Sequence, residues 1–323
     1  MADEGDDRAG GVTDPTARPP RSGLVAALGA YVFWGTFPAF WPLLEPAGSV
    51  EILAHRIAWT LVAMLVLLTL MRGWSRLRGR SWRTWATITA ASVLITVNWG
   101  VYIWGVTHDR VVESALGYYM NPLVSVVLAV LVLGERLRRT QWVAVGIATA
   151  AVAVLWVGTG ALPWVALVLA FSFGFYGLLK KRVPLAPVAG LTAEGFLLGP
   201  VAIGYLVWLQ AVGTGTFGHG TAHTLLLISA GPVTAVPLLL FAVGARRLPL
   251  ATLGLLQYVN PTLQFVWGVL VEHEPMPPAR WVGFVLVWLA LGVFAVDGWR
   301  AHRREVESRK AVSGRPVSAT GLF

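Results

Sequence analysis

The sequence predicts an all-α membrane protein with ten transmembrane helices, and three observations carry this prediction. The chain of 323 residues is 56% hydrophobic and only 13% charged, and its mean hydropathy is +0.67, a composition far too apolar for a soluble domain. Apolar runs long enough to cross about 30 Å of hydrocarbon recur along it. Basic residues lie between those runs, so the net charge of +9 requires no nucleic-acid partner.

The predicted spans follow a leader, residues 1–22, that is acidic and then rich in Gly and Pro, which is typical of a disordered tail. The spans cover residues 24–44, 50–71, 85–106, 112–133, 141–159, 163–179, 187–210, 223–243, 250–271 and 280–297. Residues 300–323 form a basic tail. With both termini on one side, that side holds every Lys and Arg except Arg56, Arg110 and Arg280. The positive-inside rule therefore predicts that both termini are cytoplasmic, in a plasma-membrane protein.

The second half of the chain repeats the first. Asn121-Pro122 recurs as Asn260-Pro261, and an acid, Glu135 or Glu274, follows each proline at the same spacing. Because each unit holds an odd number of spans, the second must enter the membrane with opposite orientation. The sequence thus predicts two inverted five-helix repeats, residues 23–160 and 161–299, an architecture from which alternating access follows.

A proline within a span leaves a backbone carbonyl without its helical partner, and such a spot is tolerated beside protein or a water-lined cavity. Polar residues form a stripe on each proline-containing span. They are Ser114, Tyr118, Asn121 and Ser125 in the fourth span and Gln257, Asn260 and Gln264 in the ninth, with Asn98 and Tyr102 as a further wall. Hydrogen bonding between helices is the alternative for any one of them, but two stripes with prolines favour a solute cavity.

Ionisable residues within spans are costly, and each is a functional candidate. Glu51 and His55 share a face of the second span, Arg56 lies about 100° round the helix from His55, and Glu194 is the counterpart of Glu51 in the second repeat. A salt bridge to a neighbouring helix is the structural alternative for Arg56. The functional interpretation is that Arg56 meets a carboxylate or phosphate on the solute while Glu51, His55 or Glu194 exchanges a proton.

Other chemistry is not indicated. The chain has no cysteine, and it carries no phosphate-binding glycine loop, nucleophile elbow or zinc motif, so we expect no catalytic residue, metal or cofactor. Glu113 is expected to favour a helix N-terminus. Glu135 and Glu274, just beyond their spans, are expected to be caps and loop anchors.

An ordered set of motifs resembles the RarD group of the EamA family, within the drug/metabolite transporter superfamily. The set comprises Phe33-Trp34-Gly35 with Pro38, residues 51–56 (EILAHR), Asn98-Trp99, residues 114–123 (SALGYYMNPL), Gly134-Glu135-Arg136, residues 176–181 (YGLLKK) and Gln257-Tyr258 with Pro261. The resemblance spans about residues 22–300 and implies a ten-helix fold of inverted repeats that exports small organic metabolites or drugs. The name of the group is associated with chloramphenicol sensitivity, and related families move amino acids.

The resulting hypothesis is a secondary transporter, and not an enzyme, that exports small amphipathic or zwitterionic solutes by alternating access. The polar stripes would bind the solute, Tyr31 and Trp34 would pack against it, and the charged residues of the second and seventh spans would couple protons. An uncoupled facilitator or exchanger is the alternative, followed by a membrane enzyme acting on lipid-linked substrates and a scaffold subunit. The sequence leaves open the solute, the direction of flux, the coupling ion and whether two copies pair as a homodimer.

Overall fold

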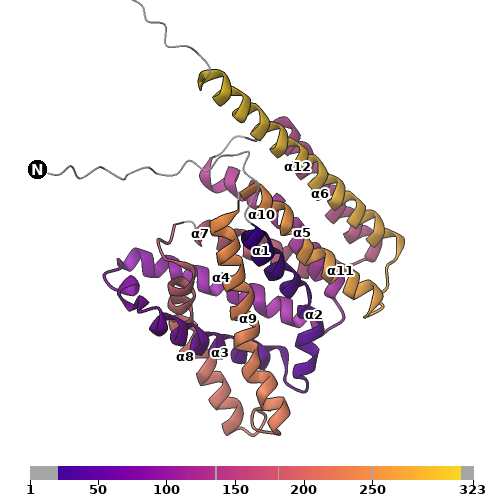
Figure 1. The fold of residues 1–323 in the computed structure, drawn as a ribbon. Helices are drawn as coiled ribbons and strands as arrows, with labels where there is room; N and C mark the ends of the chain where they lie inside the picture. The colour runs from indigo at the N-terminus through magenta and orange to yellow at the C-terminus, as the bar shows by residue number, and fades with distance from the viewer. Residues whose placement is uncertain (1–20, 135–136, 181, 249, 314–323) are drawn as a thin grey trace, which may run out of the picture.

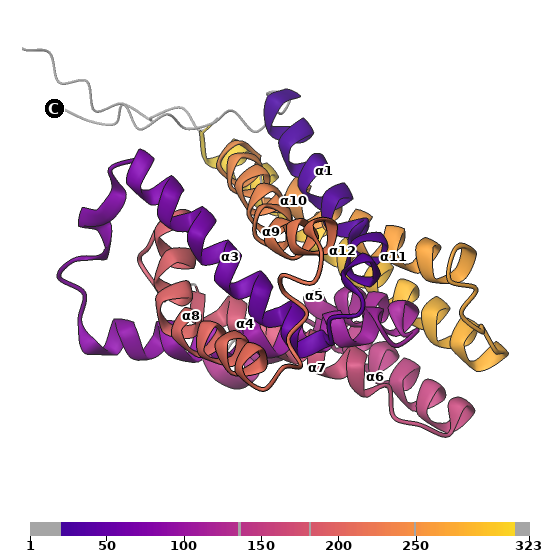
Figure 2. The same cartoon turned by 90° about the horizontal axis from the view of Figure 1, so that it is seen from below.

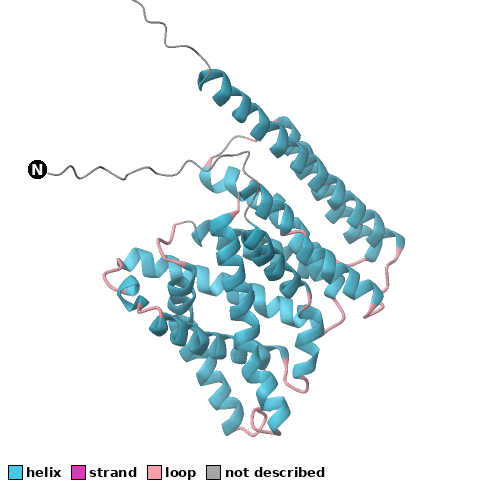
Figure 3. Cartoon of the chain, viewed as in Figure 1, coloured by secondary structure: helices cyan, strands magenta, loops and turns pink. Residues whose placement is uncertain are grey.

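A computed structural model describes residues 21–134, 137–180, 182–248 and 250–313 of the chain, and the regular structure within these ranges is entirely helical (Figure 3). The first repeat predicted from the sequence contains α1 (Arg21–Gly35), α2 (Phe37–Phe40), η1 (Trp41–Leu44), α3 (Ser49–Leu70), η2 (Gly73–Leu77), α4 (Trp82–Val106), α5 (Val111–Leu133) and α6 (Arg139–Thr159). The second contains α7 (Trp164–Lys180), α8 (Pro187–Ala211), α9 (Thr221–Arg247), α10 (Leu250–Leu256), α11 (Val259–Leu270) and α12 (Pro278–Ser313).

The described helices include seven that are long and apolar enough to cross a membrane, which establishes a multi-pass helical membrane protein. They are α3, α4, α5, α6, α8, α9 and the segment Pro278–Gly298 of α12. An eighth is added if α1 and the segment Phe37–Leu44, which meet at a bend of 46°, count as one span. α7, with 17 residues, is apolar but shorter.

The two prolines predicted to interrupt helices behave differently. α5 continues through Pro122, whereas the predicted span 250–271 is divided between α10 and α11, with Gln257 and Tyr258 at the break. Pro261 falls in the first turn of α11, where an absent N–H costs nothing because the first amides of a helix lack helical partners. The final helix also differs from its predicted end at residue 297, because α12 continues to Ser313.

α3 packs against both α8 and α9 (Figures 1 and 2). α4 packs on α7, and α5 packs on both α7 and α11. α6 and α12 lie side by side at the edge of the molecule in both views. Glycine permits the closest approaches: a Cβ added at Gly117 of α5 would lie 2.8 Å from the backbone oxygen of Ala166 on α7.

An aromatic cluster occupies the centre of this arrangement. Its buried members include Phe37, Trp41 and Tyr102, and they come from α2, η1 and α4. Trp41 is completely buried. Helices α3, α7 and α9 supply aliphatic neighbours, so the cluster joins segments that are distant in the sequence. This cluster positions the candidate site.

Candidate functional site

Arg56 projects from α3 into the aromatic cluster and is 3% exposed. The central carbon of its guanidinium lies 4.0 Å from the ring centroid of Trp99, 5.0 Å from that of Trp41 and 5.6 Å from that of Phe37. Such ring faces attract a cation, and the attraction strengthens when both partners are removed from water. Three elements, α2, η1 and α4, therefore enclose one buried positive charge.

The guanidinium of Arg56 has no carboxylate partner within 4.0 Å among the residues that the structure describes. Its Nε and Nη1 atoms are buried and have no hydrogen-bond partner in the described part of the chain. The structural salt bridge considered for Arg56 is thus not formed within the described part of the chain. A buried cation is costly unless it is compensated, and these donors suit an anionic or oxygen-rich group.

Tyr102 and Tyr118 belong to the aromatic cluster that surrounds Arg56, and Asn98 contacts Tyr118. The rings of Tyr102 and Tyr118 meet edge to face at 5.5 Å, and the buried Tyr102 hydroxyl has no hydrogen-bond partner among the described residues. The Tyr118 hydroxyl donates to Asn98 Oδ1 at 3.5 Å. Asn98 Nδ2 donates to the Leu169 carbonyl and the Ser172 hydroxyl on α7, both at 3.0 Å. The amide of Asn98 therefore joins α4 to α7, and Tyr102 retains a free hydroxyl.

Two residues of the predicted polar stripe of α5, Ser114 and Asn121, differ in their contacts. Ser114 is buried and donates to the Arg110 carbonyl at 2.9 Å, and it packs so closely on α4 that a Cβ added at Gly105 would lie 2.6 Å from its Oγ. Asn121 is half-buried, and its Oδ1 has no hydrogen-bond partner within the ranges that the structure describes. Ser114 is thus occupied by local packing, whereas the amide oxygen of Asn121 is available to a ligand.

A second group of predicted residues lies where α1 meets α9 and α11. Tyr31 and Trp34 contact each other at a ring distance of 5.7 Å, and both contact the Phe241 ring. Trp34 also packs against the central aromatic cluster. This group therefore adjoins the surroundings of Arg56.

The polar stripe of the ninth predicted span lies next to that group, but it is interrupted. Gln264 Nε2 donates to Asn260 Oδ1 at 2.8 Å, and to the Trp34 carbonyl at 3.5 Å. Gln257 is half-buried at the break between α10 and α11. Asn260 and Gln264 are therefore paired with each other, on a helix separate from the segment that carries Gln257.

Glu51 and His55, one turn apart on α3, contact the loop between α8 and α9. Glu51 Oε1 accepts the backbone N–H of Thr216 at 2.7 Å and its hydroxyl at 3.0 Å. The His55 ring stacks on Phe217 at 5.2 Å, and both ring nitrogens are buried without a hydrogen-bond partner from any described residue. These two candidates thus face a loop segment rather than the ring cage of Arg56.

Glu194 accepts a hydrogen bond from Lys180 Nζ, and the Tyr176 hydroxyl donates to the same oxygen, Oε1, at 3.5 Å. Its other oxygen, Oε2, and the hydroxyl of Thr60 are buried, and neither has a hydrogen-bond partner among the residues described by the structure. Glu194, Thr60 and Trp99 line one small cavity between α3, α4 and α8, with room for about one water molecule at about 20 Å³. Trp99 therefore contributes both to this cavity and to the ring cage of Arg56.

Three residues of this region, Thr60, Trp99 and Lys180, were not among the sequence-predicted site residues. Trp99 follows Asn98 in a family-like motif, and this was the only signal for it. Lys180 lies at the end of an apolar run and was counted among the basic residues on the cytoplasmic side. Lys180 ends α7 and Glu194 lies in α8, and α4 packs against both of these helices.

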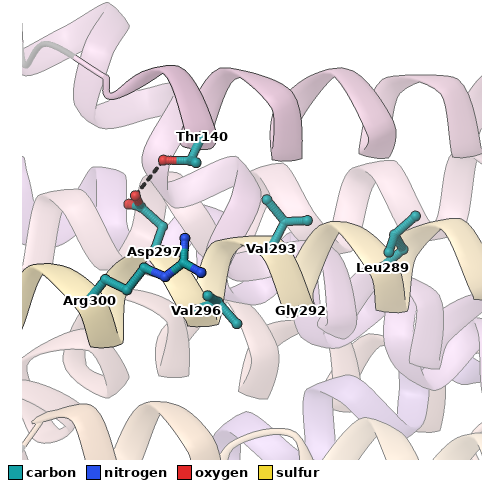
Figure 4. A pocket seen from close by; sticks show the side chains of 7 residues that line it. All are labelled: Thr140, Leu289, Gly292, Val293, Val296, Asp297 and Arg300. Carbon is teal, nitrogen blue, oxygen red and sulfur yellow. Dashed lines mark hydrogen bonds between the residues drawn. The ribbon is translucent and has the colours of Figure 1, made fainter.

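A larger cavity of about 350 Å³ lies between α6 and α12 (Figure 4). Its lining includes Thr140, Asp297 and Arg300 with the apolar side chains of Leu289, Val293 and Val296. Asp297 accepts the Thr140 hydroxyl and pairs with Arg138 at 2.9 Å. No sequence-predicted site residue lines it, so we do not assign the solute site there.

The acids at the span ends hold helix termini, as the sequence predicts. Glu274 Oε1 accepts the backbone N–H of Val112 at the start of α5 at 3.0 Å, and Glu113 Oε1 accepts that of Val165 at the start of α7 at 2.9 Å. Burial raises the pKa of Glu274, in the loop before α12, to about 7. Glu135 lies outside the described residues.

Comparison with known proteins identifies the class of protein to which the chain belongs. Residues 21–157 match the model of the EamA-like transporter family. Protein RarD of Streptomyces exfoliatus is 53% identical over 287 residues, covering 88% of this chain and 91% of that protein. Protein RarD of Escherichia coli K12 is 41% identical, covering 89% and 98%. A Pseudomonas aeruginosa relative named chloramphenicol-sensitive protein RarD is 31% identical, covering 88% and 96%.

The helical membrane fold and these relatives together define a membrane transporter. The chain belongs to the RarD group of the EamA-like transporter family. A solved structure described as "Crystal structure of protein" has a TM-score of 0.56 and 19% identity, covering 87% of this chain and 99% of its own; this likeness concerns the fold alone. The names of the relatives point to a role other than catalysis.

Proposed function

We propose that this protein is a secondary transporter of the plasma membrane that exports small organic solutes by alternating access, and that Arg56 receives an anionic or oxygen-rich group of the solute. The observation that carries the proposal is the burial of Arg56 among Trp99, Trp41 and Phe37 with free N–H donors and no acidic partner among the described residues. A guanidinium matches carboxylate, phosphate or nitro oxygens with its planar fork of donors.

The solute classes that fit are organic metabolites, amino-acid-like molecules and drugs such as chloramphenicol, which appears in the name of one relative. The free hydroxyl of Tyr102 and the free amide oxygen of Asn121 supply further polar contacts. Tyr31, Trp34, Tyr118 and the amides of Asn98, Gln257 and Asn260 complete the proposed wall, and Ser114 holds α5 against α4. Aromatic walls with a few polar groups are typical of small-molecule sites.

Two inverted five-helix repeats in a ten-span arrangement, with both termini cytoplasmic, would provide the alternating access. Helices or helix pairs cover all ten predicted apolar segments, which supports this topology together with the distribution of Lys and Arg. A homodimer is compatible with the proposal but not required by it.

Proton coupling is the proposed energy source, and Glu194 is the first candidate to carry the proton. Its Oε2 is free and borders a cavity of water size, whereas the Oε1 atom of Glu51 is held by Thr216. His55, with two free nitrogens, is the second candidate. An uncoupled facilitator or exchanger is the alternative, in which Glu194 and Lys180 form only a structural ion pair.

The test is solute-driven proton movement in proteoliposomes that contain a pH-sensitive dye, with a panel of amino acids and chloramphenicol as probes. We expect a solute-dependent pH change in the wild type, its loss in Glu194→Gln, and its retention in Glu45→Gln, a substitution of the same chemistry at an exposed position. Solute movement without a pH change, equal in all three proteins, would support the facilitator instead.

A further inference from the structure

The loop between α8 and α9, residues 212–220, lies over the side chains at the first turns of α3. Thr216 donates its backbone N–H and its hydroxyl to Glu51 Oε1. A carboxylate only accepts, so the hydroxyl proton of Thr216 points to Glu51, and His223 Nε2, at 3.0 Å from Thr216 Oγ1, must be the donor of that contact. Three side chains from α3, the loop and α9 thus form one chain of hydrogen bonds.

Phe217, the next residue of the loop, places its ring against α3. The ring stacks on His55 at 5.2 Å and lies 6.3 Å from Trp59. It also packs against the central aromatic cluster, which includes Phe37 and Trp41 of the cage around Arg56. Phe217 therefore covers one end of the region in which the proposed solute site lies.

The contacts of the loop with α3 differ from those with its own helices. Gln210 Nε2 donates to the Phe217 carbonyl at 2.8 Å, and Gly218 donates its N–H to Thr224 at 3.0 Å, so the loop shape is maintained by α8 and α9. Thr216 and Phe217 contact α3 through the side chains of Glu51, His55 and Trp59. Because α8 and α9 maintain the shape of the loop, it can separate from these α3 side chains without unfolding.

We propose that residues 212–220 are a lid on the solute site, with Phe217 as its plug and Glu51 and His223 as positioning residues that hold Thr216 in the closed state. The lid rests on the proposed function, because it closes the route to Arg56 from the end of α3 where Ser49 lies. It assigns Glu51 to lid closure, and leaves proton exchange to Glu194 or His55. Lid opening is then one of the conformational steps that alternating access requires.

The natural chain has no cysteine, so one introduced cysteine is a unique reporter. We would place it in the aromatic cluster against which Phe217 packs, as Ile52→Cys and, in a second series, as Ala230→Cys, two positions that are fully buried. Labelling by a membrane-impermeant maleimide is followed in right-side-out and inside-out vesicles of the full-length protein. No solute is needed, so this result is independent of the transport assay.

Closed-lid proteins should label slowly at both reporters. Glu51→Gln and Phe217→Ala should each raise the labelling rate about tenfold, because a charged hydrogen bond or a packed ring is lost, and only from the side predicted to be external. Glu45→Gln is the matched control and should leave the rate unchanged. Thermal unfolding identifies a variant that is simply misfolded. If Glu51→Gln or Phe217→Ala fails this check, the labelling rate of the other variant tests the lid.

Equal labelling rates in the folded wild-type, Glu51→Gln and Phe217→Ala backgrounds would overturn the lid, as would an increase seen only from the cytoplasmic side. Faster labelling in Glu51→Gln and Phe217→Ala would support the lid whatever the transport assay shows. If Arg56→Gln also transports solute as well as wild type does, the proposed solute site is refuted and the lid stands. The two proposals can therefore fail separately.

Discussion

The guanidinium of Arg56 lies 4.0 Å from the ring centroid of Trp99, and these two residues come from neighbouring helices, α3 and α4. Trp99 also lines the small cavity shared by Thr60 and Glu194, and Glu194 pairs with Lys180. The Trp99 side chain is thus a wall common to the ring cage of Arg56 and to this cavity.

Replacement of Trp99 tests that wall. Trp99→Leu removes the ring under a buried cation, and we expect a loss of about 1 to 2 kcal/mol in the free energy of unfolding. Trp99→Phe retains a ring face and should lose less. Unfolding of the purified protein by a denaturing detergent measures both, and a larger loss for Phe than for Leu would contradict a role for the ring face.

Asn98 and Asn121 should respond differently to the same substitution. Asn98→Ala removes two hydrogen bonds to α7 and the acceptor of the Tyr118 hydroxyl, so we expect about 1 to 3 kcal/mol of destabilisation. Asn121→Ala removes an amide whose oxygen has no partner. It should preserve expression and membrane insertion but weaken solute transport. Thermal unfolding and uptake kinetics separate these effects, and unchanged kinetics would remove Asn121 from the site.

Glu274 should make stability depend on pH. Its pKa is raised to about 7 from an ordinary value of 4.5, so the folded protein binds this proton more tightly than the unfolded chain. The stabilisation is complete below about pH 4.5, decreases as pH rises towards 7 and is absent above it. Glu274→Gln should flatten that part of the pH profile of thermal unfolding. An identical slope in wild type and variant would show that another group is responsible.

Gly231 should be intolerant of a side chain. A Cβ added there would overlap the backbone of Trp59 on α3, so Gly231→Ala must separate α9 from α3, at a cost of about 1 to 3 kcal/mol. Gly146→Ala is the control, because nothing lies within 4 Å of its added Cβ. Unfolding in detergent compares the two. Equal stability of the two variants would show that the helices shift without cost.

Hydropathy predicted where the helices lie, because each apolar run must bury its backbone hydrogen bonds within a helix. Every predicted span coincides with a helix or a helix pair. The sequence did not distinguish Pro122, within the continuous α5, from Pro261, in the first turn of α11. Both follow asparagine in apolar runs, and their position relative to a helix start depends on the surrounding packing.

The polarity of residues within apolar spans identified the candidate site residues, but it did not identify the residues that they contact in the fold. Arg56 was singled out because a charge within a span is costly, whereas its aromatic cage comes from residues 19 positions earlier and 43 later, Phe37 and Trp99. No periodicity connects such residues. Glu51 was equally conspicuous as an intramembrane acid, yet its partner Thr216 lies 165 residues away in a loop. Charge thus identifies the candidate residues. Only their tertiary contacts show which ones line a cavity, which hold a loop and which bind a helix terminus.

The central claim is that Arg56 binds the solute, and counterflow of labelled solutes into proteoliposomes tests it most directly. The panel would pair carboxylates with their neutral amides and include chloramphenicol, and the proteins would be wild type, Arg56→Gln and the exposed control Arg83→Gln. We predict that wild type and Arg83→Gln exchange at least one solute of the panel, with the carboxylate preferred over its amide, and that a correctly inserted Arg56→Gln loses this exchange. Equal exchange by Arg56→Gln would contradict the account.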